Sequence, residues 1–230
     1  MQFEILTLFP EIFSSFLGES LIKRAIQAKQ IQVNLYNFRQ HGLGKHQQVD
    51  DAPYGGGPGM VLRVEPIYHA LVTRDTYYRQ QQLKTHKILL TPQGLPFTQE
   101  KAVELSQTSQ VLVFICGRYE GFDERVRLYV DEEISGGDFV CLGGEVVAML
   151  MMEVISRLIP GVLGNQASSQ TESFARGTLE YPQYTRPPVF EKAAVPDVLV
   201  SGNHQHIEAW RHAEAITRTK KQRPDLLKNI

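Results

Sequence analysis

The chain has 230 residues, of which 42% are hydrophobic and 21% are charged. This length predicts one large domain or two small ones, with a core that needs no disulfide scaffold, and the 18 glycines and 12 prolines are too few for a disordered or collagen-like chain. With 24 basic and 25 acidic residues the net charge is −1, which excludes a general polyanion binder, so any nucleic acid would have to bind a local basic surface.

The cysteines and the apolar runs narrow the class of protein further. Cys116 and Cys141 lie in apolar runs without CxxC spacing, which argues against a secreted disulfide framework and a cysteine-rich zinc site. No uninterrupted apolar stretch reaches 18 residues, so we expect no membrane span. The first residues lack the basic flank and long apolar core of a signal peptide. We therefore expect a cytoplasmic protein.

Strand-like and helical patterns alternate along roughly the first 160 residues. Strands are predicted, in chain order, at residues 3–9, 31–36, 87–90 and 111–115. Helices are predicted at residues 19–29, directly after Thr98, and at 145–158. The run at 111–115 is apolar throughout, as in a central parallel strand that is covered on both faces. The alternation predicts an α/β layer architecture.

The composition changes after this region. Residues 160–177 are small, polar and turn-rich, which is typical of a linker or mobile loop. A helical tail follows, and its residues 201–230 hold six basic and three acidic side chains. A solvated helix face and an RNA contact explain this excess about equally well. The single tryptophan, Trp210, is expected to be a packing anchor in the tail.

Four glycine-bearing segments stand out. In the first, Tyr54–Met60, clustered glycines allow positive φ or a close approach of backbone to a ligand. No Gly-Lys-Ser/Thr or GxGxxG spacing accompanies it, so a plain tight loop is the favoured interpretation. The other three begin at Thr91, Cys116 and Ser135, near the ends of predicted strands or ahead of a helix.

Each of these three segments, taken singly, is most simply a turn with a turn-forming glycine. Ligands of open α/β sheets bind beyond the carboxyl ends of the strands, however, and three such loops together predict one shared ligand pocket. No HExxH or GxSxG motif and no metal-spaced histidine cluster is present, so no metal site is predicted. We expect His41, His46, His204 and His206 to be solvated.

Taken in order, these segments resemble the bacterial tRNA (guanine-N1)-methyltransferase family of the SPOUT superfamily. The matching stretches are TLFPEIF, VDDAPYGGGPGMV, TPQG, CGRYEGFDERV, GGDFVCLGGE, SRLIPGVLG, ESFARG and EYPQYTRPP, with SGNH and AWR in the tail. They span nearly the whole chain, and such a series is far more specific than any single motif.

The resemblance implies an α/β fold in which a mainly parallel sheet contains a deep trefoil knot, followed by a small helical C-terminal domain. It implies a knotted methyltransferase domain at 1–160, a flexible linker at 161–177 and a helical tRNA-binding domain at 178–230. Because chains rarely thread loops, the residue patterns alone would indicate an ordinary doubly wound sheet. The family also implies a homodimer with composite active sites and no membrane attachment.

The implied reaction is methyl transfer from S-adenosylmethionine to N1 of the guanine immediately 3′ of the anticodon in tRNA, with S-adenosylhomocysteine as product. The implied cofactor contacts are Pro92, Gly117, Tyr119, Glu120, Gly136, Gly137, Asp138, Phe139, Val140, Cys141, Gly143 and Gly144. The implied substrate contacts are Ser168, Arg186 and Lys220. A dependence on Mg²⁺ stays open.

The implied catalytic residues are Arg157 and Glu172. N1 of guanine keeps its proton at neutral pH, so the reaction needs a general base there, which is the role implied for Glu172. Arg157 would stabilise the negative charge that accumulates on O6. The chain departs from the family at Glu172, where the family characteristically has Asp, and at Phe139 and Cys141, where it usually has Tyr and Leu.

Two other functions stay open at this point. One is a SPOUT methyltransferase that acts on a different RNA, to which the departure at Glu172 gives some weight. The other is a non-catalytic RNA-binding protein that has kept adenosylmethionine only as a ligand; the retained carboxylate and arginine argue against it. A nicotinamide-dependent oxidoreductase would need a GxGxxG turn, which is absent.

Overall fold

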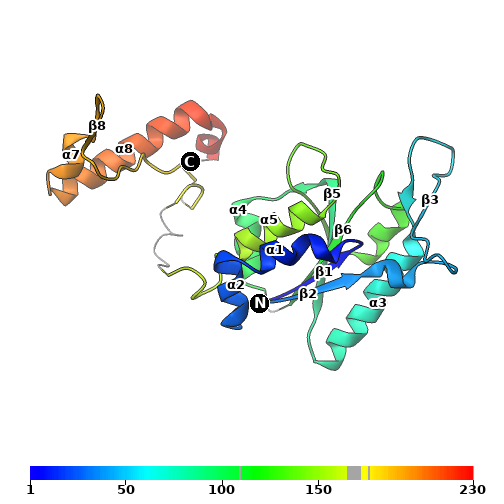
Figure 1. Ribbon diagram of the computed structural model, residues 1–230. Coiled ribbons are helices and arrows are strands. Elements are labelled where there is room, and N and C mark those ends of the chain that lie inside the picture. The colour runs from blue at the N-terminus through cyan, green and yellow to red at the C-terminus, as the bar shows by residue number, and fades with distance from the viewer. Residues whose placement is uncertain (109, 165–171, 176, 230) are drawn as a thin grey trace. The chain divides into compact units, whose positions relative to one another are not determined.

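A five-stranded parallel sheet forms the centre of the first unit of the chain, Met1–Gly164 (Figure 1). The structure, a computed structural model, describes residues 1–108, 110–164, 172–175 and 177–229. The strands are β1 (Gln2–Thr7), β2 (Gln32–Asn37), β5 (Thr85–Pro96), β6 (Val111–Cys116) and β7 (Glu132–Ser135). Their order is β2-β1-β6-β5-β7, and every pairing is parallel. The predicted α/β class with a mainly parallel sheet is confirmed.

Strand β6 is central because its sequence is apolar on both faces, and all six of its residues are buried. Its alternate side chains pack into two separate apolar clusters on the two sides of the sheet. One cluster takes Leu112, Phe114 and Cys116, and the other takes Val111, Val113 and Ile115. The sheet is therefore covered on both faces, as the unbroken apolar run predicts.

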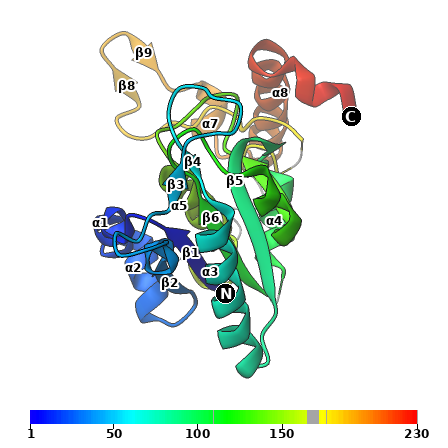
Figure 2. The ribbon, with the colours of Figure 1, turned by 90° about the vertical axis from the view of Figure 1, so that its right-hand side faces the viewer.

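Helices cover both faces. The cluster around Phe114 receives α1 (Ser14–Leu17), α2 (Ser20–Gln27), α4 (Gln99–Ser106) and α5 (Glu145–Ser156). The opposite face is covered by the long helix α3 (Val64–Gln80), seen in Figure 2. The Thr98 hydroxyl accepts a hydrogen bond from the Lys101 amide at 3.2 Å, which caps α4 at its predicted start.

Shorter elements complete this unit. The antiparallel pair β3 (Asp50–Asp51) and β4 (Val61–Leu62) carries the glycine segment between its strands. Single 3₁₀ turns lie at η1 (Pro10–Phe13), η2 (Phe38–His41) and η3 (Glu124–Tyr129). None of the helices in the described ranges combines the length and the apolar character needed to cross a membrane.

The second unit, Asn165–Ile230, is built around one long helix. Its elements are the small pair β8 (Val189–Phe190) and β9 (Ala193–Ala194), the helices α7 (Asp197–Val200) and α8 (His204–Gln222), and the 3₁₀ turn η4 (Pro224–Asn229). The extended segment before β8 is tied to α8, because the Leu179 amide donates to Thr219 Oγ1 at 2.9 Å and Arg218 Nη1 donates to the Glu180 carbonyl at 3.3 Å.

Candidate cofactor and substrate site

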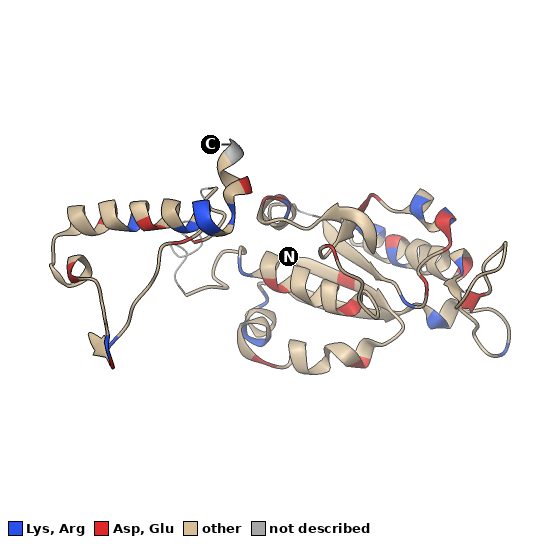
Figure 3. Ribbon diagram, turned by 90° about the horizontal axis from the view of Figure 1, so that it is seen from above, with Lys and Arg blue, Asp and Glu red and all other residues tan. Residues whose placement is uncertain are grey.

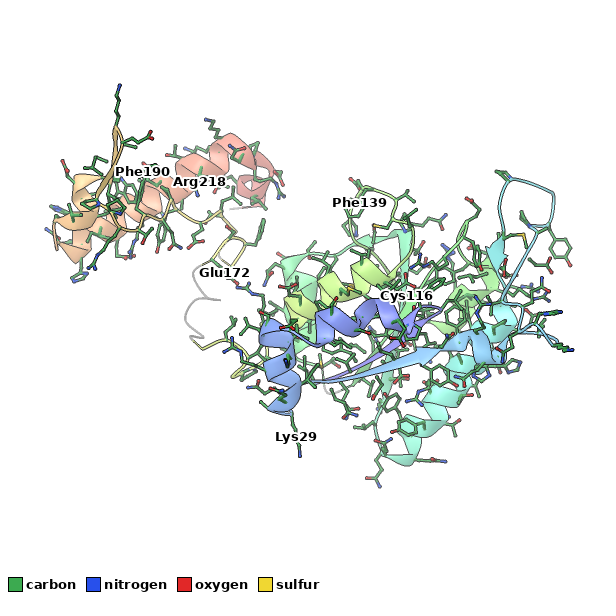
Figure 4. The ribbon with its side chains drawn as sticks, viewed as in Figure 1. Lys29, Cys116, Phe139, Glu172, Phe190 and Arg218 are labelled. Atoms are coloured by element: carbon green, nitrogen blue, oxygen red, sulfur yellow. The ribbon has the colours of Figure 1, made fainter. Side chains whose placement is uncertain are left out.

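Three segments at the carboxyl end of the sheet enclose a cavity of about 170 Å³. They are the bulged part of β5 at residues 90–92, the loop 117–122 after β6, and residues 134–144, which run from the end of β7 to the start of α5. Figure 4 labels Cys116 at the end of β6 and Phe139 on the loop before α5. These are the three glycine-bearing segments that the sequence predicts to share a pocket.

Most of the residues named as cofactor contacts lie at this cavity. Those that line it are Pro92, Gly117, Tyr119, Glu120, Gly136, Phe139, Val140, Cys141, Gly143 and Gly144. Gly137 and Asp138 belong to the same loop but are not part of the wall. The structure adds the wall residues Leu90, Thr91, Arg118, Gly121, Phe122, Ile134, Ser135, Leu142 and Val147. Six of them lie in the glycine-bearing segments singled out from the sequence, whereas Leu90, Ile134 and Val147 lie in β5, β7 and α5 and carry no motif signal.

The glycines before α5 allow the backbone to pack directly on the end of β6. A Cβ atom at Gly144 would lie 2.8 Å from the Cα of Cys116, closer than any side chain can approach. The Gly144 amide donates to the Gly117 carbonyl at 3.0 Å. The two loops that form opposite walls of the cavity are therefore joined backbone to backbone, and no larger residue fits at position 144.

A buried ion pair also connects the loop after β6 to the start of α5. Glu145, the first residue of α5, is 1% exposed, and its Oε2 lies 3.0 Å from Arg118 Nη2. Its Oε1 accepts from Arg118 Nε at 3.2 Å and from the Thr7 hydroxyl at 2.8 Å. The guanidinium also lies 4.6 Å over the ring of Phe9. Arg118, which is part of the cavity wall, and Glu145 thus connect β1, the loop after β6 and α5.

The two cysteines differ sharply in their surroundings. Cys116 is fully buried, and burial, with the nearby Glu145 carboxylate adding to it, raises the pKa of its thiol well above the ordinary value. It is therefore an inert core residue. Cys141 is exposed on the cavity wall. Both thiols are free, which agrees with the absence of a disulfide framework predicted from their spacing.

The glycine segment Tyr54–Met60 lies against this site. Four of its glycines have positive φ, as a tight loop requires, and a Cβ at Gly59 would lie 2.5 Å from Glu120 Cγ. The Glu120 amide donates to the Met60 carbonyl at 3.0 Å. The segment is a tight loop, as favoured from the sequence, and it also supports the wall of the cavity at Glu120.

Neither of the two implied catalytic residues is among the residues that line this cavity. Arg157 caps the far end of α5, where its amide donates to the Glu153 carbonyl at 3.1 Å. It lines another cavity, of about 260 Å³, together with Glu153 and Ser156. At 1.5 Å per residue, Arg157 lies about 20 Å along the helix axis from Gly144. Glu172 belongs to the second unit.

The three implied substrate contacts belong, like Glu172, to the second unit of the chain. Ser168 lies outside the described residues. Arg186 lines a cavity of the second unit, and Lys220 lies exposed in the last turn of α8. Within the described ranges no cluster of three or more His, Cys, Asp or Glu side chains could hold a metal ion.

Comparison with known proteins identifies the family. The model of the family "tRNA (Guanine-1)-methyltransferase TrmD" matches residues 1–229. Relatives from Staphylococcus aureus strains JH9, Newman and JH1, each named tRNA (guanine-N(1)-)-methyltransferase, are 53% identical over 228 residues, which cover 99% of this chain and 91% of the relative. The motifs, the pocket that they form and the match along the whole chain lead to one conclusion: the chain belongs to the tRNA (guanine-1)-methyltransferase TrmD family.

Proposed function

We propose that this protein transfers a methyl group from S-adenosylmethionine to N1 of the guanine immediately 3′ of the anticodon in tRNA. The observation that carries the proposal is the cavity at the carboxyl end of the sheet, which is walled by the three glycine segments on which the family resemblance rests. The names of the relatives support the reaction and the RNA class. We further propose that the protein acts in the cytoplasm.

The cavity suits a nucleoside with an extended polar side chain. Its wall combines exposed apolar side chains, such as Phe139 and Leu142, with Gly117 and Gly143, where a Cβ would lie 2.8 Å from the Phe122 ring and 2.5 Å from Arg118 Nε. These loops would hold S-adenosylmethionine, which supplies, when bound, a methyl group activated by the sulfonium charge. Gly137 and Asp138 lie in the loop before α5 but not in the cavity wall, and they would set the conformation of that loop.

We also propose that this region is the trefoil knot expected for the family. The support is the direct backbone packing of Gly144 on Cys116 and Gly117. A Cβ at Gly94, in the bulged part of β5, would likewise lie 2.5 Å from the carbonyl carbon of Glu133 in β7. Contacts this close are what a chain passing through a narrow backbone loop would make.

Guanine N1 is a poor methyl acceptor because it carries a proton, and two side chains would make it reactive. Glu172 would remove the proton from N1, because the N1 lone pair attacks only after that proton leaves. General base catalysis of this kind contributes about 10²–10⁴-fold. Arg157 would donate hydrogen bonds to O6, where negative charge develops only as N1 loses its proton. Glu carries one methylene more than Asp, so its backbone must stand slightly farther from N1.

The position of Arg157 supports a composite site in a homodimer. About 20 Å along the α5 axis separates it from Gly144, farther than one arginine side chain extends. Val146 and Leu150, one turn apart on α5, lie between them, and with Leu142 just before the helix they form an apolar stripe whose residues are 63%, 45% and 93% exposed. Two copies that paired antiparallel along this stripe would cover it and bring Arg157 of one copy to the cavity of the other.

The second unit would bind the tRNA. Its long helix α8 ends in basic residues, including Lys220 and Lys221, as Figure 3 shows. Arg186 and Lys220 are exposed and would contact the phosphate backbone, with Ser168 as a further contact. The chain as a whole has a net charge of −1, so a local basic surface of this kind is what RNA binding requires.

The test is transfer of labelled methyl from S-adenosylmethionine to two tRNA transcripts that differ only in having guanine or adenine 3′ of the anticodon. We expect label on the guanine transcript alone. Glu172→Gln should lower turnover about 10²–10⁴-fold and Arg157→Ala about 10²–10³-fold. Glu191→Gln, at an exposed carboxylate of the β8–β9 turn, is the matched control and should keep full activity.

Each alternative has its own outcome in this assay. Label on a ribosomal RNA fragment but on neither transcript would indicate a methyltransferase for another RNA. Binding of S-adenosylmethionine without transfer to any RNA would indicate a non-catalytic protein. Full activity of Glu172→Gln would remove that residue from the role of base while leaving the reaction in place.

A further inference from the structure

The second unit contains a wide cavity of its own, of about 1010 Å³. One wall is the extended segment 181–188, and the other comes from α7 and α8. All of its lining residues belong to the second unit, so the cavity exists without any contribution from the methyltransferase sheet. The implied reaction assigns no role to it beyond a contact at Arg186.

Two tyrosine rings line this cavity, and each is in contact with a side chain of α8. Tyr184 is 50% exposed, and its ring centroid lies 6.4 Å from that of Trp210 at an angle of 49°. The Tyr181 ring carries the guanidinium of Arg211 4.9 Å above its centroid. Arg211 is in turn anchored by Glu208, 2.6 Å away. Tyr184 is therefore braced by a neighbouring ring and still offers a surface to a ligand.

The charge of the lining selects the ligand. Among the described residues that line the cavity, Arg186 and Arg211 are the charged ones, and none is acidic. The rest of the lining is aromatic, proline or aliphatic, apart from one Gln and one Thr. Flat rings with guanidinium groups in an apolar setting suit a planar aromatic group attached to an anionic chain. Unpaired bases of single-stranded RNA are bound in this way, by stacking on aromatic side chains and on arginine.

We propose that this cavity, which we call the Tyr184 pocket (residues 181–188 with Leu199, Ile207 and Arg211), stacks an unpaired nucleobase of the RNA substrate. The proposal rests on the proposed function, because it takes the substrate to be a tRNA with a single-stranded loop. Arg186 and Lys220 would contact phosphates, which strand and duplex both offer. The pocket would add a contact to a base, which a duplex cannot make because its bases are stacked inside. The second unit would then distinguish a loop from a stem.

The chain carries its own probe for this site. Trp210 is the single tryptophan, so its fluorescence reports on the neighbourhood of Tyr184. The full-length protein is titrated at constant salt with a nineteen-nucleotide single-stranded RNA that cannot pair with itself and, separately, with a blunt ten-base-pair RNA duplex, which has the same number of internucleotide phosphates. We expect a saturable change in Trp210 emission with the single strand and a much weaker response to the duplex.

Variants separate stacking from general folding of the unit. Tyr184→Leu keeps an apolar side chain against Trp210 but removes the ring, and should weaken single-strand binding about tenfold. Tyr184→Phe keeps the ring and should bind like the unchanged protein. Phe190→Ala, at a 69% exposed ring outside the cavity (Figure 4), is the matched control and should also leave binding unchanged.

Each of the following binding results would overturn the proposal: equal responses to strand and duplex, no change in emission with either RNA, or unchanged binding by Tyr184→Leu. Methyl transfer is measured on the same variants to keep the two proposals apart. Strand binding without any methyl transfer would leave the pocket and remove the proposed reaction. Methyl transfer to tRNA with unchanged kinetics in Tyr184→Leu would leave the reaction and remove the pocket.

Discussion

At the scale of single residues, the ion pair between Arg118 and Glu145 joins the walls of the cavity at the carboxyl end of the sheet. The carboxylate is fully buried and has the Thr7 hydroxyl and the guanidinium as its partners. Removing one partner of a buried pair leaves an uncompensated charge, which is far more destabilising than losing a pair at the surface. Because Arg118 is itself part of the cavity wall, loss of the pair should also loosen the cavity.

Arg118→Met should therefore lower the free energy of unfolding by about 3 kcal/mol, measured by urea denaturation. It should also weaken S-adenosylmethionine binding, measured by calorimetry. Arg125→Met is the matched control, because Arg125 pairs with Asp123 at 2.6 Å in the same region but is 63% exposed. It should change neither quantity appreciably. Equal effects of the two substitutions would show that the buried pair has no special part in the cavity.

At the scale of elements, polar contacts join a helix or a strand to its neighbours where the sequence pattern gives no sign of them. Arg74 of α3 places Nε 2.8 Å from Oε1 of Glu4, which is fully buried in β1. Tyr78 of the same helix donates to Glu4 at 2.5 Å, and burial together with this contact raises the pKa of Tyr78 to about 12. Helix α3 was not predicted from the sequence, because part of its attachment to the sheet is polar and leaves no clean apolar stripe.

A second polar group joins β5, β7 and α4, and it makes stability depend on pH. His86 and Glu132 lie 2.7 Å apart, and Lys101 lies 3.1 Å from the same carboxylate. The hydrogen bond to Glu132 raises the pKa of His86 from 6.5, and the hydrogen bond from His86 lowers the pKa of Glu132 from 4.5. The histidine contribution is complete below about pH 6.5 and is lost as the pH rises through the raised value. The carboxylate contribution is present above about pH 4.5 and is lost as the pH falls through the lowered value.

The pair is thus strongest between about pH 4.5 and 6.5. His86→Gln, which cannot take up a proton, should destabilise the protein by up to about 1 kcal/mol at pH 5.5 and by less at pH 8, measured by urea denaturation at both values. His46→Gln, at an exposed loop position, serves as the control and should show no such difference. A loss for His86→Gln that is the same at both pH values would contradict the assigned ion pair.

At the scale of the whole molecule, the proposed homodimer makes the sharpest prediction. Leu150→Glu puts a charge on α5 at one end of the exposed stripe, where two copies would bury it. We expect this variant to sediment as a monomer in analytical ultracentrifugation and to lose methyl transfer, because Arg157 would no longer reach a cavity. Val72→Glu is the control, since Val72 is also 45% exposed but lies on α3. If the protein without substitutions is monomeric at micromolar concentration, the composite site is ruled out.

The sequence predicted four of the five strands and the cavity because these follow from local signals, but it missed the short edge strand β7. The apolar run of β6 specifies a central strand, and glycines after strands mark where backbones meet. The helix predicted at 145–158 already separates Arg157 from Gly144 by about 20 Å. The sequence could not show the second cavity that Arg157 lines, because the opposite wall of that cavity comes from residues 15–22, which only the fold brings close to it. Nor could it find wall residues such as Leu90 and Val147, whose side chains are ordinary core types that acquire a role only through their position.

The strand order has a consequence for how the protein is made. Strand β1 is paired on both edges, yet one of its two neighbours, β6, begins at Val111, 74 residues after β2 ends at Asn37. At 5–20 residues per second a ribosome needs roughly 4–15 s to synthesise that interval. During this time β1 and β2 can pair, but the other edge of β1 and its buried side chains have no partner. The nascent chain therefore needs the protection of a chaperone most in the interval before β6 is synthesised.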